Sequence, residues 1–172
     1  MKLIRPLFAA LFTVFFFAAA SAPANAQGLA ERRAIKQYQD TKYPELKKKI
    51  DEAAGFDVHM TVNWDQLAVA GAADSYMNDN FFSDIYFYPL IDALKTITKD
   101  DMGKQALKAK LKEIVIKFDP STAPATDYEG GWPFKDGVLT INYQPGVNSS
   151  GRDSVDFRER VAALTKNLEA GL

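Results

Sequence analysis

The stretch from Phe56 to Trp64 alternates apolar and polar residues without a break. Its apolar positions are Phe56, Val58, Met60, Val62 and Trp64, and its polar positions are Asp57, His59, Thr61 and Asn63. Successive side chains of a β-strand point to opposite faces, so the pattern predicts a strand with one buried and one exposed face. A pairing shift of one residue would bury the polar set, so the register of this strand is tightly constrained. We therefore expect the fold to be organised around a sheet that contains this strand.

Helical spacings precede the strand. From Leu29 to Ala54, apolar residues recur at intervals of three and four. Pro44 interrupts the pattern. The residue before a proline is pushed out of the α region, whereas proline is accepted in the first turn of a helix. The sequence thus predicts one helix to about Asp40 and a second helix that begins at Pro44 and ends before Gly55.

Further helices are expected after the strand. A short helix over residues 65–70 should end at Gly71, since glycine often follows the last helical residue. Pro89 should begin the next helix, which leaves Tyr88 extended. Asp100 or Asp101 should cap another helix, and Asp153 or Ser154 should cap the last one, because short polar side chains satisfy free N–H groups at helix starts.

Three more strands are predicted in the second half of the chain. Residues 114–118 form an apolar run, and Asp136-Gly137 is a strong hairpin signal because its turn requires positive φ angles. Residues 138–143 would be the return strand, and Pro133 places the incoming strand at a sheet edge. The order helix, helix, strand, helices, strand, strand, strand, helix predicts an α+β fold with a mostly antiparallel sheet of about four strands and helices packed on one face.

The N-terminus has the three parts of a secretory signal. Lys2 and Arg5 give a positive start, residues 7–20 are apolar but too short to span a bilayer, and Ala24-Asn25-Ala26 is a small-residue cleavage site. We expect residues 1–26 to be a signal peptide and residues 27–172 to form a single α+β domain. No stable membrane anchor is expected after cleavage.

The amino-acid composition limits the cellular compartment in which the protein can work and the kinds of partner it can bind. The chain has no cysteine, so disulfides, thiolate chemistry and a cysteine lipid anchor are excluded. Export without disulfides favours a bacterial periplasm or release to the medium. Loss of Lys2 and Arg5 with the signal changes the net charge from −1 to −3. Proteins that bind nucleic acids usually carry clustered positive charge, whereas this chain has a net negative charge. No nucleic-acid partner is therefore expected.

Searches for catalytic motifs find none. His59 is the single histidine, which excludes zinc sites built from several histidines. No glycine-flanked serine elbow or glycine-rich nucleotide loop occurs. The acidic residues of the 119–131 loop do not have the spacing of a calcium loop. No catalytic residue, metal site or cofactor is therefore predicted, although paired carboxylates far apart in sequence stay possible.

If the protein binds a ligand, the exposed face of the sheet and the adjoining loop are the expected site, because binding residues concentrate on loops carried by a rigid scaffold. The candidate residues are His59, Thr61, Asn63, Thr140 and Asn142 on strands, with Tyr128 and Trp132 on the loop. Aromatic rings with polar tips beside amide and hydroxyl groups suit a polar ligand such as a glycan or a peptide. The alternative is a solvated face with Trp132 folded onto the core.

Two functional hypotheses follow. The first is a non-catalytic binding or accessory protein of the periplasm, or a secreted one, that recognises a protein or a small polar ligand. The second is a hydrolase that acts on cell-envelope polymers through carboxylates or His59. The discriminating feature is whether acidic residues converge with His59 in a cleft.

Overall fold

The structure is a computed structural model that describes residues 28–172, so the predicted signal peptide lies outside the described residues. The elements are α1 (Leu29–Thr41), α2 (Tyr43–Ala54), β1 (Met60–Val62), the 3-10 helices η1 (Trp64–Leu67), η2 (Ala73–Ser75) and η3 (Asp79–Phe81), α3 (Ser83–Ile97), α4 (Asp101–Lys110), β2 (Glu113–Lys117), α5 (Tyr128–Gly131), β3 (Phe134–Lys135), β4 (Val138–Asn142) and α6 (Val155–Gly171). Apart from α5 and the short 3-10 helices η2 and η3, which lie in segments expected to be loops, this is the order that the sequence predicts.

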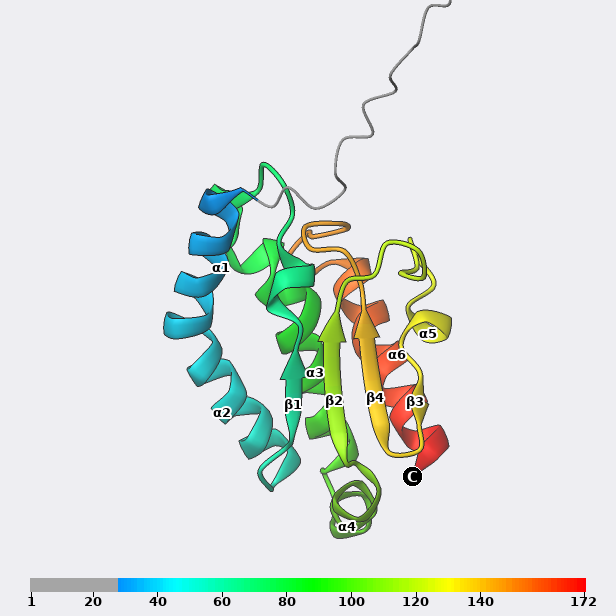
Figure 1. Cartoon of the computed structure of the whole chain (residues 1–172). Coiled ribbons are helices and arrows are strands. Elements are labelled where there is room, and N and C mark those ends of the chain that lie inside the picture. Colours follow the sequence, from blue (N-terminus) through cyan, green and yellow to red (C-terminus); the bar gives the residue numbers. More distant parts are fainter. Residues whose placement is uncertain (1–27) are drawn as a thin grey trace, which may run out of the picture.

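The sheet is mixed and mostly parallel. Its strand order is β1-β2-β4-β3 (Figure 1). β2 runs parallel to both β1 and β4, and the β3–β4 hairpin supplies the antiparallel pair among the described strands. The α+β prediction is confirmed, but the prediction of a mostly antiparallel sheet is wrong. The reason is that α3 and α4 form a crossover that returns the chain to the start of β2, and such crossovers join parallel strands.

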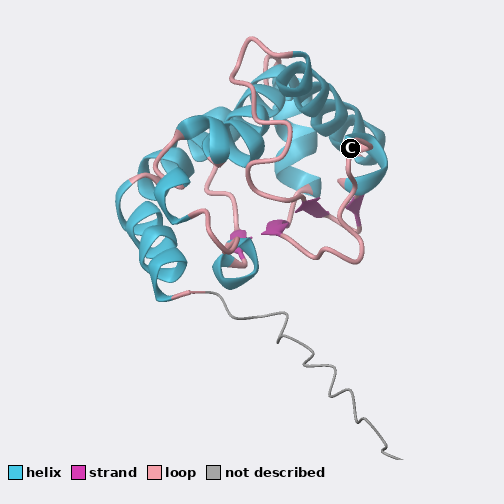
Figure 2. Ribbon diagram, turned by 90° about the horizontal axis from the view of Figure 1, so that it is seen from above, coloured by secondary structure: helices cyan, strands magenta, loops and turns pink. Residues whose placement is uncertain are grey.

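The helices are distributed unevenly over the sheet. The view along the strands shows α3 and α6 on one side, with α1 and α2 beside the β1 edge (Figure 2). The strand residues that face α3 and α6 are completely buried: Ile114, Ile116, Leu139 and Ile141. In residues 28–172, no helix covers β2 and β4 on the opposite side, so this side is the open face of the sheet (Figures 1 and 2).

The first strand is shorter than the alternating pattern predicts. β1 contains three residues, and Trp64 begins η1 instead of ending the strand. The preceding residues lie outside the strand, although the His59 carbonyl accepts from the Ile114 N–H of β2 at 2.9 Å, and the Val58 N–H donates to Asp51 Oδ1 at 2.9 Å. The predicted faces hold, because Met60 aligns with buried Ile114 and Thr61 aligns with half-buried Val115. Alternation thus identified the faces of this strand but not its ends.

Pro89 lies inside α3 instead of beginning it. The helix starts at Ser83, so the prediction of an extended Tyr88 is wrong. An internal proline lacks an N–H donor and costs about 3 kcal/mol. Burial offsets this cost, because the side chains of Tyr86 and Phe87 in the first turns are completely buried. Tertiary packing of the aromatic run therefore decides the local structure.

The predicted caps and hairpin are confirmed. Asp100 accepts a hydrogen bond from the Gly103 N–H, and Ser154 accepts one from the Phe157 N–H. Asp136 and Gly137 have φ angles of 54° and 88°, as the expected two-residue turn requires. These signals depend on neighbouring residues alone, which explains why the sequence shows them directly.

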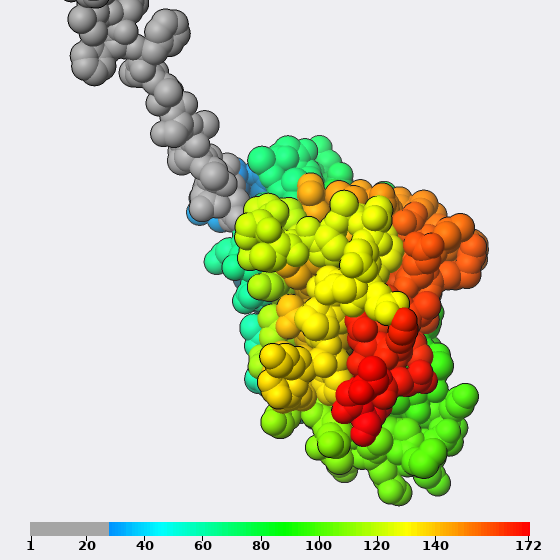
Figure 3. Space-filling view, turned by 90° about the vertical axis from the view of Figure 1, so that its right-hand side faces the viewer, coloured from blue at the N-terminus to red at the C-terminus, as the bar shows by residue number. Residues whose placement is uncertain are grey.

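A buried arginine ties the end of the chain to the loop before it. Arg160 of α6 is 1% exposed, and its Nη2 donates to the Val147 and Asn148 carbonyls at 3.1 and 2.8 Å. Its guanidinium carbon lies 5.0 and 5.4 Å from the ring centres of Tyr128 and Tyr143. Figure 3 shows this side of the molecule, where the 118–133 loop lies beside the C-terminal end of α6.

Candidate functional site

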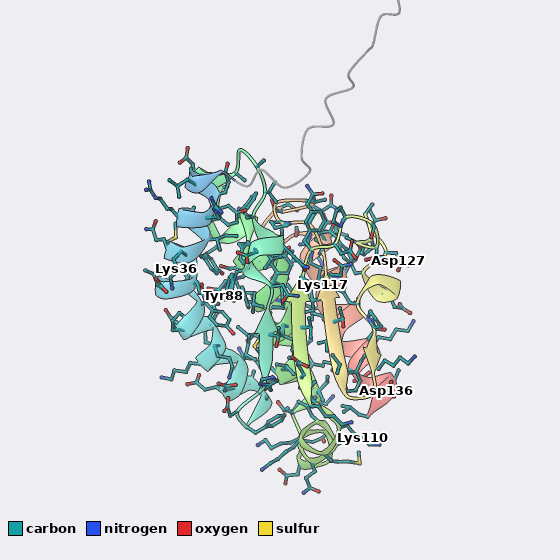
Figure 4. All side chains as sticks on the ribbon, viewed as in Figure 1. Lys36, Tyr88, Lys110, Lys117, Asp127 and Asp136 are labelled. Carbon is teal, nitrogen blue, oxygen red and sulfur yellow. The ribbon has the colours of Figure 1, made fainter. Side chains whose placement is uncertain are left out.

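The open face is built from matching rows of side chains. The pairing register places Thr61, Val115 and Thr140 side by side across β1, β2 and β4. All three side chains are half-buried. Glu113 and Lys117 lie two positions before and after Val115, and therefore share its face. Lys117 marks the carboxyl end of β2 (Figure 4). The face thus has a row of β-branched side chains across its centre and opposite charges at its two ends.

His59 lies at the lower rim of this face beside an acid and a hydroxyl. Its Nε2 is 3.7 Å from Glu113 Oε1, and the Thr61 hydroxyl donates to the same oxygen at 2.6 Å. The imidazole is widely exposed, with 72% of its side-chain surface accessible. In a hydrolase triad the imidazole lies between the hydroxyl and the carboxylate, so that it can take the proton. Here the carboxylate is in the middle, and His59 has no hydroxyl to activate.

Asn63 and Asn142 occupy the upper end of the face in different ways. The Asn63 N–H extends the ladder by donating to the Ile116 carbonyl at 2.9 Å, and its side chain is half-exposed. Asn142 is 4% exposed. Its Oδ1 accepts from the Asp119 N–H at 2.8 Å and its Nδ2 donates to the Thr122 hydroxyl at 3.0 Å. Asn142 therefore anchors the loop that follows β2, and its amide is used within the chain.

The two loop aromatics do not expose their rings. Tyr128 is 3% exposed and Trp132 is completely buried. The rings pack together with Tyr143, and the Tyr128 hydroxyl donates to Asp156 Oδ1 at 3.0 Å. Burial raises the pKa of Tyr128. The expectation that these residues add aromatic area to the site is wrong, because α6 and β4 supply an apolar surface that covers them.

The structure brings together part of the predicted set. His59, Thr61, Asn63 and Thr140 share the open face, whereas Asn142 is covered by the 119–122 turn. Ligand contact by the four remains a prediction. The sequence analysis missed Glu113, Val115 and Lys117. Glu113 and Lys117 lie on either side of the run from Ile114 to Ile116, and because Val115 is itself apolar, this run resembles a continuous apolar strand.

The described residues give no sign of a metal centre. In residues 28–172, no three side chains of the metal-ligating types gather closely enough to hold an ion. None of the helices in this part of the chain is long and apolar enough to cross a membrane.

The described hollows lie away from the open face. Two of them follow α3, one between α2 and α3 and one between α3 and α6, with volumes of about 420 and 620 Å³. A smaller one of about 290 Å³ lies between α5 and α6. The open face and these hollows are therefore separate candidate surfaces.

The chain matches no protein-family model, and no curated protein or solved structure is significantly similar to it. The functional argument consequently depends on the geometry of the chain itself.

Proposed function

We propose that this protein is a non-catalytic binding or accessory protein, exported to the periplasm or the medium, that docks a protein partner on the open face. The supporting observation is that β1, β2 and β4 are parallel strands with one face uncovered. Parallel strands occur almost only in sheets with both faces covered. A partner that covers this face would give the sheet the burial that its strand arrangement normally has.

The chemistry of the face defines what the partner presents. The central row of Thr61, Val115 and Thr140 offers small β-branched groups, which suit close packing against another segment. Glu113 and Lys117 at the two ends favour a partner with a basic group near Glu113 and an acidic group near Lys117. The hydroxyls of Thr61 and Thr140 and the His59 ring add hydrogen-bonding groups.

The size of the face limits the affinity. The three strands have three, five and five residues and cover at most roughly 14 by 16 Å, far less than the roughly 800 Å² that each partner buries in a stable complex. The partner must therefore also contact the 119–122 turn and η1, or bind transiently. Both cases favour a single strand or helix of a protein over a large rigid surface.

The hydrolase alternative has less support. Around His59 the order of groups is wrong for activating Thr61, as described above. Asp84, the carboxylate with the clearest burial, pairs with Arg152 on the helical side of the molecule. Asp84 and His59 therefore lie apart, and the acid beside His59 is Glu113.

Site-specific photocrosslinking tests the proposal. A benzophenone amino acid replaces Val115 in one variant and Val155 in another, and both proteins are produced in the source bacterium. Val155 is a matched control, because it is also a valine and is 61% exposed at the start of α6. We expect a discrete protein adduct from position 115 and none from position 155. A product of two copies of this chain would identify self-association, and absence of any adduct at 115 would reject the proposal.

A further inference from the structure

The second feature of interest lies on the helical side, where Arg152 is held rigidly but incompletely bonded. Its guanidinium carbon is 3.3 Å from the ring centre of Tyr88. Its Nε donates to Asp84 Oδ1 at 3.4 Å, and the Asp84 side chain is 5% exposed. The ring and the buried carboxylate fix the plane of the guanidinium. Arg152 itself is 54% exposed.

The terminal nitrogens of Arg152 have no hydrogen-bond partner among residues 28–172. The contacts of this guanidinium are the Tyr88 ring and the Nε bond to Asp84. A guanidinium fork with two free terminal amino groups matches the two oxygens of a carboxylate. Because the plane is already fixed, little conformational entropy is lost when an anion binds. This geometry favours a carboxylate as the ligand group at Arg152.

An unpaired carboxylate lies on the same surface. Asp92 follows Tyr88 by one helical turn on α3, so the two side chains are neighbours on one face. No ion pair or hydrogen bond to the Asp92 carboxylate occurs among the described residues. Asp92 and Arg152 both line the hollow between α2 and α3 and also the hollow between α3 and α6. A free cationic fork and a free carboxylate therefore border the same two hollows without binding each other.

Most other charged side chains around these hollows are paired; the hollow between α3 and α6 is also lined by Glu169 and by Lys166, which pairs with Glu129. Lys49 is paired with Glu45 at 2.7 Å, and Glu52 lies 3.7 Å from Lys48. Arg158 donates to the Asp153 carbonyl at 2.7 Å. Lys95 is exposed and adds a positive charge on the same side as Arg152. A simple anion bound at Arg152 would be repelled by the Asp92 carboxylate. A simple cation bound at Asp92 would be repelled by the Arg152 guanidinium.

The hollows also supply apolar surface and sufficient space. Phe157 and Val161 line the larger one, while Ile91 and Ala53 line the smaller one. Their volumes, about 620 and 420 Å³, are in the range of small-molecule sites. We propose that the surface where Arg152 and Asp92 meet binds a zwitterionic ligand of the amino-acid class. Its carboxylate bonds to the Arg152 fork, its ammonium bonds to Asp92, and its apolar side chain lies against Phe157 and Val161.

Three small probes test this site in the folded protein. L-leucine carries both charges, L-leucinamide lacks the carboxylate, and N-acetyl-L-leucine lacks the ammonium. Titration is followed by amide chemical shifts in ¹H–¹⁵N NMR spectra. We expect leucine to give saturable shifts in α3, α6 and residues 151–153 at millimolar or lower concentration. Each of the other two probes should bind at least about tenfold more weakly, since each loses one charge-assisted contact.

Matched variants complete the test. Arg152→Lys keeps the charge but removes the fork, and Asp92→Asn removes the carboxylate; each should weaken leucine binding at least about tenfold. Arg158→Lys, on the rim of the same hollow, should bind leucine as the wild type does. Asp92 has no internal partner, so Asp92→Asn tests the site even if Arg152→Lys lowers stability. The proposal is overturned if leucine causes no saturable shifts, or if all three probes bind equally.

Discussion

Ile116 and Val115 are adjacent on β2, yet the first is completely buried against the helices and the second is half-exposed on the open face. This difference gives a direct test of the assignment of the two faces. Ile116→Ala should lower the free energy of unfolding by about 2–5 kcal/mol, because it leaves a cavity in the core. Val115→Ala should cost about 1 kcal/mol or less. Urea unfolding followed by tryptophan fluorescence measures both, and equal losses would contradict the assignment.

Gly137 and Gly71 separate two effects of a left-handed backbone. Both have positive φ angles, 88° and 78°, but a Cβ at Gly137 would lie 2.6 Å from the Lys110 carbonyl, whereas a Cβ at Gly71 meets nothing within 4 Å. Gly71→Ala should cost about 1–2 kcal/mol from φ strain alone. Gly137→Ala should cost clearly more, since it adds a clash with backbone. Thermal unfolding by circular dichroism compares the two, and a larger loss at Gly71 would show that the contact at Gly137 relaxes.

Asn142→Ala should release the turn that follows β2. The substitution removes the acceptor of the Asp119 N–H and the donor to the Thr122 hydroxyl. We expect a loss of about 1–3 kcal/mol, as for other buried hydrogen-bonded groups. Amide hydrogen exchange should speed up at Asp119, Ser121 and Thr122 more than at Ile116. Unchanged exchange at Asp119 would mean that the turn is held by its own hydrogen bonds.

Asp84 should make the folded protein more stable as the pH falls, which is opposite to the usual effect of a carboxylate. Burial raises the pKa of Asp84, while nearby Arg152 and Arg160 lower it and Asp79 raises it. Because the folded-state pKa exceeds the unfolded value of about 3.9, the folded state binds this proton more tightly. Protonation of Asp84 therefore contributes to the free energy of unfolding in full below about pH 3.9. This contribution is lost as the pH rises through the folded-state pKa of Asp84.

The Asp84→Asn variant isolates this effect, because the amide does not titrate. We expect the stability of the wild type relative to Asp84→Asn to increase as the pH falls from 7 towards 4. Urea unfolding at several pH values measures the difference. A difference that stays constant, or that decreases on acidification, would contradict the prediction.

Export gives a prediction that does not depend on the described fold. The N-terminal charges, the apolar segment and Ala24-Asn25-Ala26 predict cleavage before Gln27. Mass spectrometry of the protein from the periplasm and medium of expressing cells should find a chain that starts at Gln27. A dominant species that retains residues 1–26 would show that the signal assignment is wrong.

Local signals made much of the secondary structure predictable. The caps at Asp100 and Ser154, the Asp136-Gly137 turn and the faces of β1 depend on adjacent residues or on simple alternation. Whether two neighbouring strands pair in parallel or antiparallel depends on the segment of chain that joins them. A strand, two helices and a second strand form the pattern of a parallel crossover, which could have corrected the antiparallel prediction.

Long-range packing accounts for what the sequence analysis missed. Pro89 is held inside α3 by buried neighbours, and Trp132 is covered by elements distant in the chain. Arg160 is buried in α6, and no local sequence pattern marks it. For the candidate site, alternation identified the exposed positions of β1 and β4, but no local pattern marks the pairing of Asn142 with the 119–122 turn or the position of Arg152 on Tyr88.

The parallel arrangement also has a consequence for how the chain reaches this structure. Met60 pairs with Ile114, far along the sequence, and α3 packs against α6, the last helix. Parallel pairing of distant segments slows folding, because long loops must close before the strands can pair. During synthesis the α1–α2 segment can form early from local contacts, but the buried face of the sheet is not fully covered until residues 155–171 have emerged. The domain therefore stays incompletely folded until α6 has been made.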